Sequence, residues 1–115
     1  MGTAAGNPSL DRAVALSRVG GDTELLKEIA RLFLDDYPRV LNELRDALAR
    51  GDAKAVERTA HGLKGSVANF GAAAAVEAAC TIEAMGRSQQ LAEVGQVIRI
   101  LELALAALHS ELETL

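Results

Sequence analysis

The chain has 115 residues, a formal net charge of −4 and 50% hydrophobic residues, with only 3% aromatic residues. This length suits one domain with a single, mainly aliphatic core. No block of basic residues supplies the charge that binds nucleic-acid phosphates, so we expect no nucleic-acid partner. The longest apolar run is far shorter than a membrane span, which predicts no association with a membrane.

Cysteine usage and the start of the chain bear on cellular location. The single cysteine, Cys80, cannot form a disulfide within the chain. No charged segment followed by an apolar one opens the sequence as a signal peptide would. Both observations predict a reduced, cytoplasmic protein.

The composition predicts an all-α protein, because alanine and leucine are abundant, proline is rare and no alternating strand-like run occurs. Residues 1–8 are mostly small or polar and predict a flexible N-terminal tail before one domain over residues 9–115. Within that domain, glycines and capping residues separate helical segments. The expected helices span residues 9–18, 23–49, 53–69, 72–85 and 89–114.

The first two helices have recognisable start signals. Ser9 is the expected N-cap of the first helix, in which Leu10 and Ala13 face inward. Asp22 is the expected N-cap of the second helix, which is predicted to kink at Pro38 because proline removes one backbone hydrogen bond. The core positions expected in this helix are Leu25, Ile29, Leu32, Phe33, Val40, Leu44, Ala47 and Leu48.

The third helix carries an apolar stripe that leaves His61 outside the core. Residues three or four apart share one face of a helix. His61, Lys64, Gly65 and Ala68 fall away from the centre of the stripe, on the open face of the helix or its edge. The stripe itself is Val56, Ala60, Leu63, Val67 and Phe70.

The last helix repeats leucine and other aliphatic residues at spacings of three and four along its length. Together with the three preceding long helices, it predicts an antiparallel up-down four-helix bundle with a short extra N-terminal helix. The repeat would also suit a coiled-coil dimer, but the bundle already uses this stripe, so we expect a monomer.

The segment around His61 admits several readings, of which a surface histidine without function is the plainest. No spacing of cysteine, histidine or carboxylate residues predicts a metal site, and His109 is expected as a solvated side chain near a helix end. Neither a nucleophile elbow nor a glycine-rich phosphate loop occurs, so the sequence supports neither a serine hydrolase nor an ATP site.

Nucleophilic attack by the imidazole on phosphorus is the chemistry that remains, since histidine can form covalent intermediates. Lys64 follows His61 by one turn, where its ammonium can stabilise a transferring phosphoryl group. A helical side chain covers the turn before it, so Gly65 leaves the imidazole open to a large donor. Glycine inside a helix costs about 0.5–1 kcal/mol relative to alanine, which suggests that this opening is used.

Residues 60–66, Ala-His-Gly-Leu-Lys-Gly-Ser, resemble the signature of histidine-containing phosphotransfer (HPt) domains. The resemblance covers residues 10–86, and the last helix agrees with it in length and type. Further matching residues are Gly20, Gly21, Asp22, Glu24, Leu25, Leu26, Phe33, Leu34, Pro38, Asn69, Gly71, Ala72, Cys80, Ile82 and Glu83.

The resemblance implies a module of a two-component phosphorelay. His61 would accept a phosphoryl group from a receiver-domain aspartate, usually of a hybrid sensor histidine kinase, and pass it reversibly to a response regulator. Lys64 would stabilise the phosphoryl group, and Gly65 would be the steric opening. The chain itself would hold no cofactor, because the receiver supplies the magnesium ion. The alternative is a non-phosphorylated helical binding module that docks a receiver or a kinase through the same face.

The resemblance also implies a role for Glu83, which matches a position whose polar side chain often contacts the imidazole. A carboxylate that accepts from Nδ1 would orient the ring and leave Nε2 as the nucleophile. A partly exposed glutamate without this role is an equal alternative. Ser66 is expected either to bond to the helix backbone or to assist at the site, and a neutral small residue is an equal reading.

A docking receiver is expected to cover the third helix and the kinked second helix and to extend toward the short first helix. Gly65 and Ala68 would give it an approachable centre, and Leu34 or Tyr37 would add apolar contact if exposed. The expected basic rim, which would face the acidic pocket of a receiver, is Lys54, Arg58 and Lys64.

Overall fold

A computed structural model describes residues 9–115, so the predicted tail at residues 1–8 lies outside the described residues. The prediction of an all-α protein is confirmed, because residues 9–115 contain helices and no strand. The helices are α1 (Arg12–Arg18), α2 (Thr23–Ala49), α3 (Ala53–Ala68), α4 (Ala73–Arg87) and α5 (Val94–Glu113).

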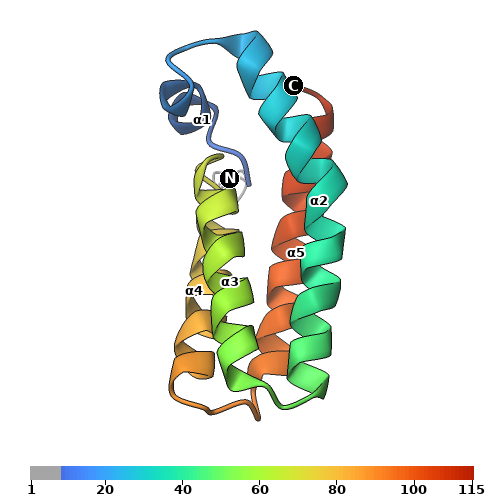
Figure 1. The fold of residues 1–115 in the computed structure, drawn as a ribbon. Helices are drawn as coiled ribbons and strands as arrows, with labels where there is room; N and C mark the ends of the chain where they lie inside the picture. The colour runs from blue at the N-terminus through green and yellow to red at the C-terminus, as the bar shows by residue number, and fades with distance from the viewer. Residues whose placement is uncertain (1–8) are drawn as a thin grey trace, which may run out of the picture.

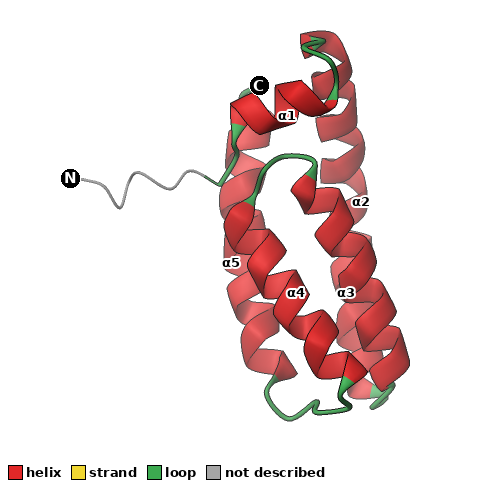
Figure 2. Cartoon of the chain, turned by 90° about the vertical axis from the view of Figure 1, so that its left-hand side faces the viewer, coloured by secondary structure: helices red, strands yellow, loops and turns green. Residues whose placement is uncertain are grey.

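The four long helices lie side by side as a bundle, and α1 lies across one end of it (Figures 1 and 2). Each long helix packs against the next one in the chain, and α5 closes the bundle against α2. The predicted antiparallel bundle with an extra N-terminal helix is therefore confirmed. The last helix begins at Val94 rather than at residue 89, because Gln89 has a left-handed φ of 58° that ends the preceding turn.

The predicted N-cap of α1 is wrong. Asp11, not Ser9, caps this helix, and its carboxylate accepts from the backbone N–H of Val14 at 3.1 Å. The backbone N–H groups of Ser9 and Leu10 instead donate to the Glu111 carboxylate of α5, at 2.8 and 3.1 Å. The chain before α1 is thus tied to the end of α5.

The turn between α3 and α4 packs directly against the start of α1. Gly71 has a left-handed φ of 61°, and a Cβ at this position would lie 2.6 Å from the Cβ of Asp11. Only glycine allows α1 to approach this closely. Ala15 is the buried alanine of α1, whereas Ala13, which was expected to face inward, is exposed.

Helix α2 continues through Pro38, and Asp22 caps it as predicted, accepting from the backbone N–H of Leu25 at 3.0 Å. In Figure 1 the first turns of α2 are inclined to the rest of the helix. Two predicted core residues are wrong, since Leu25 and Leu32 are 41% and 69% exposed. The predicted core residues Phe33, Leu44 and Ala47 are buried. The helix also buries three residues that were not predicted, Leu26, Ala30 and Leu41.

Helix α3 buries its predicted stripe in full, and the close packing of α4 on α3 then sets the position of the site. Gly86 of α4 lies against the α3 backbone, where a Cβ would meet the backbone nitrogen of Glu57 at 2.7 Å and the carbonyl oxygen of Ala53 at 2.9 Å. Glu83 lies one turn before Gly86 and is thereby brought beside α3. The buried stripe residues are Val56, Ala60, Leu63, Val67 and Phe70.

Candidate functional site

His61 lies on the open face of α3, with 67% of its side chain exposed. The buried residues on either side of it, Ala60 and Leu63, anchor the helix in the core. The helical turn therefore presents the imidazole to solvent on a rigid support.

Glu83 of α4 contacts the imidazole, and only 7% of the Glu83 side chain is exposed. Its Oε2 lies 2.8 Å from Nδ1 of His61, and its Oε1 lies 2.6 Å from Nζ of Lys64. An ionised carboxylate only accepts hydrogen bonds, so the geometry assigns the proton to Nδ1 and leaves the lone pair on Nε2. Glu83 is thus buried and in contact with the ring rather than partly exposed.

Arg87 is a further member of the site that sequence reasoning missed. One of its terminal nitrogens lies 3.1 Å from Oε2 of Glu83, and its Nε lies 3.0 Å from Oε2 of Glu57 on α3. The signal was present in the sequence, because a cation four residues after a glutamate on a helix commonly pairs with it. Arg87 therefore joins the two helices that carry the site.

The Glu83 carboxyl stays ionised although it is buried. Hydrogen bonds from Lys64 and from His61 hold the pKa of this carboxyl below its ordinary value of 4.5, against the opposing effect of burial. A buried carboxylate with several donors is a fixed negative charge beneath the imidazole.

The lowered pKa of Glu83 predicts a pH-dependent contribution to stability. A carboxyl whose pKa is lower in the folded state contributes stability that is present above its unfolded pKa and is lost as the pH falls through the folded pKa. We expect the stability difference between the wild type and Glu83→Gln to be constant near pH 7 and to shrink below about pH 4.5. Urea unfolding at a series of pH values measures this difference, and a value that does not change with pH would contradict the prediction.

The imidazole borders a surface hollow of about 630 Å³ between α3 and α4, here called the histidine hollow. Gly65, one turn after His61, is exposed, and a Cβ at this position would meet nothing within 4 Å, so the surface beside Gly65 is open. Ala68 is half-buried at the end of the same face. The charged residues that line the hollow are Lys54, Glu57, Arg58, Glu83 and Arg87.

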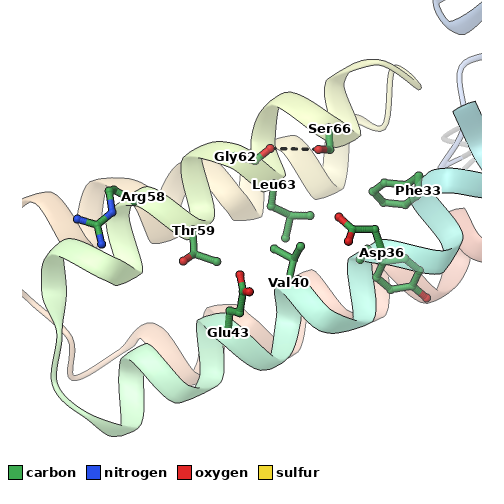
Figure 3. A pocket seen from close by; sticks show the side chains of 10 residues that line it. Phe33, Asp36, Val40, Glu43, Arg58, Thr59, Gly62, Leu63 and Ser66 are labelled. Atoms are coloured by element: carbon green, nitrogen blue, oxygen red, sulfur yellow. Dashed lines mark hydrogen bonds between the residues drawn. The ribbon is translucent and has the colours of Figure 1, made fainter.

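A second cavity of about 290 Å³ lies between α2 and α3 and is called the α2–α3 groove (Figure 3). Val40 and Leu63 point toward each other across it, and Arg58 points away from it at one end. The Ser66 hydroxyl donates to the carbonyl oxygen of Gly62 at 3.2 Å, so this serine bonds to the helix backbone. The groove and the histidine hollow share Arg58 and Gly62 and therefore adjoin on α3.

His109 differs from its expected solvated state, because it contacts Tyr37 of α2. The Tyr37 hydroxyl lies 2.7 Å from Nδ1 of His109, and Nε2 of His109 lies 3.3 Å from the Glu113 carboxylate. Tyr37 also stacks on Phe33, with ring centroids 5.1 Å apart. His109 is therefore a half-buried link between α5 and α2 rather than a free side chain near a helix end.

Residues 9–115 contain no cluster of three or more histidine, cysteine or carboxylate side chains placed to hold a metal ion. None of the helices in this range combines the length and the apolar character that crossing a bilayer requires.

Comparisons with known proteins agree with this architecture. The chain superposes on histidine-containing phosphotransfer protein B from Pseudomonas aeruginosa PAO1 with a TM-score of 0.86, at 27% identity over 93% of each chain. Its fold is also similar to the HPT domain of the Hpt sensor hybrid histidine kinase from Shewanella, with a TM-score of 0.79 at 20% identity over 92% of each chain. No protein with a curated description matches.

The family model described as Hpt domain matches residues 28–113, a range that includes His61, Lys64, Gly65 and Glu83. The resemblance drawn from the sequence motif is thereby confirmed. Because the match spans most of the chain, the protein belongs to the Hpt domain family, the histidine phosphotransfer modules of two-component phosphorelays.

Proposed function

We propose that His61 is the phospho-accepting residue, and that it takes a phosphoryl group from a receiver-domain aspartate and passes it reversibly to another receiver. The observation that carries this proposal is the exposed imidazole whose Nδ1 is held by the buried Glu83 carboxylate at 2.8 Å. This contact fixes the ring orientation and directs the nucleophilic lone pair of Nε2 outward.

The transfer step requires no separate base, because the attacking Nε2 carries no proton. The Nε2 lone pair forms the N–P bond while the P–O bond to the receiver aspartate breaks, and the departing carboxylate takes the electron pair. The proton stays on Nδ1, so the phosphorylated ring becomes cationic and Glu83 stabilises it. Lys64, with its Nζ held 2.6 Å from Glu83, is placed beside the ring to stabilise the phosphoryl oxygens.

We propose that the receiver docks over the histidine hollow and the adjoining α2–α3 groove. Gly65 and Ala68 have no side chain or a small one, so a receiver can approach the centre of this face closely. The exposed Lys54 and Arg58 lie at its edge. These cations suit the acidic pocket in which a receiver binds magnesium. The proposal thus places the metal ion on the receiver and the nucleophile on this chain, in a partner that belongs to a response regulator or to a hybrid sensor kinase.

A transfer assay with a panel of labelled, phosphorylated receivers tests this function. We expect one or more receivers to label the wild-type chain with an acid-labile, base-stable phosphate, and peptide mapping to locate it on His61. Addition of an unlabelled second receiver should then remove the label from the chain. Failure of every receiver to label the folded chain would instead favour the binding-module alternative, and a pull-down with the same receivers would test it.

A substitution at Gly65 should separate access to His61 from fold stability. The added Cβ of Gly65→Ala meets nothing within the chain, so helix propensity should raise the free energy of unfolding by about 0.5–1 kcal/mol. The same methyl group would project into the open space beside His61 through which a docked receiver must approach, so transfer from the receiver should slow. Urea unfolding and a transfer time course measure the two effects. Gly95→Ala on α5 is the control, and equal transfer rates in all three proteins would contradict the role of Gly65.

A further inference from the structure

The Glu83 carboxylate has three hydrogen-bond partners at once. Its Oε1 binds Lys64, while its Oε2 is shared by Nδ1 of His61 and a terminal nitrogen of Arg87. The glutamate is almost fully buried, whereas 63% of the Arg87 side chain is exposed. A buried carboxylate depends on its cations, because an isolated buried charge is costly.

The inference rests on the proposed function, in which Lys64 stabilises the phosphoryl group that His61 accepts. Nζ of Lys64 lies 2.6 Å from Glu83 in the unphosphorylated chain. If Lys64 moves toward the phosphoryl oxygens on Nε2, its contact with Glu83 weakens. The ring then gains positive charge, and Arg87 is the other cation in contact with the carboxylate that can keep it in place at Nδ1.

We propose that Arg87 is a positioning residue that holds the Glu83 carboxylate on the imidazole while Lys64 turns to the phosphoryl group. Arg87 is suited to this task because Glu57 of α3 binds its Nε at 3.0 Å and orients the guanidinium. One of the two terminal nitrogens is then directed at Oε2 of Glu83, four residues earlier on α4. Arg87 acts through Glu83 and makes no contact with the phosphoryl group.

A double-mutant cycle with a small phosphoryl donor tests this role without a receiver. Phosphoramidate is used to phosphorylate four proteins: the wild type, Arg87→Ala, Glu83→Gln and the double variant. We expect Arg87→Ala to slow labelling of His61 by about three- to tenfold, which is less than a buried hydrogen bond to a charged group contributes, because the guanidinium is exposed. In the Glu83→Gln background the same substitution should change the rate by less than about twofold, because the charge that Arg87 serves is absent.

Two further variants separate positioning from folding. Arg87→Lys keeps a cation within reach of Glu83 and should recover part of the lost rate, whereas Arg99→Ala on α5 should label at the wild-type rate. Circular dichroism and urea unfolding check that each variant is folded.

Two results would overturn the inference. An equal loss on removing Arg87 in both backgrounds would mean that Arg87 acts on the phosphoryl group directly. No loss in the wild-type background would mean that Lys64 and His61 hold Glu83 without it. The proposed function can fail separately, because receivers that exchange no phosphate with His61 would refute it while the cycle with phosphoramidate still decides the role of Arg87.

Discussion

Replacing His61 with glutamine should abolish labelling by a phosphorylated receiver and leave the bundle intact. Glutamine keeps a polar side chain of similar length but has no nucleophilic ring nitrogen. Because 67% of the His61 side chain is exposed, the substitution leaves no cavity in the core. The measurement is a transfer assay beside urea unfolding, with label below detection and an unchanged unfolding midpoint as the expected pair of results.

His109→Gln is the matched control for this experiment. It removes the other histidine, which lies on α5 and contacts the Tyr37 hydroxyl, and it should leave the label in place. Label on the His61→Gln variant, or its loss from the His109→Gln variant alone, would place the phosphorylated residue elsewhere.

Replacing Gly86 with alanine should destabilise the fold, although alanine is the better helix former. The new Cβ would lie 2.7 Å from the backbone nitrogen of Glu57 and 2.9 Å from the carbonyl oxygen of Ala53. Backbone atoms cannot turn aside as a flexible side chain can, so α3 and α4 must separate. Overpacking of this kind typically costs about 1–3 kcal/mol. Urea unfolding measures the loss, and transfer should also slow because Glu83 moves with α4.

Gly62→Ala on α3 is the control for stability, since a Cβ there meets nothing within 4 Å. It should stabilise the chain by about 0.5–1 kcal/mol, the opposite sign to the change at Gly86. A Gly86→Ala variant as stable as the Gly62→Ala variant would show that α3 and α4 do not need this close approach.

Much of the site was predictable because it depends on local spacing. The stripe of α3 has one clear apolar face, so His61 had to lie away from the core. Asp22 caps α2 as predicted because a carboxylate can accept from the free backbone N–H groups of the next turn. The motif around His61 also sufficed to indicate the family, as the match over residues 28–113 confirms.

The contacts between helices were decided by the tertiary structure. Helix α2 has apolar residues on more than one face, and its packing against α3 and α5 buried Leu26 while Leu32 stayed exposed. The closeness of α3 and α4 at Gly86 brought Glu83 under His61 and added Arg87 to the site. The sequence by itself determined which faces the helices have, because side-chain spacing along a helix is local. Which faces meet depends on distant residues, so only the tertiary structure decided the partners of Glu83.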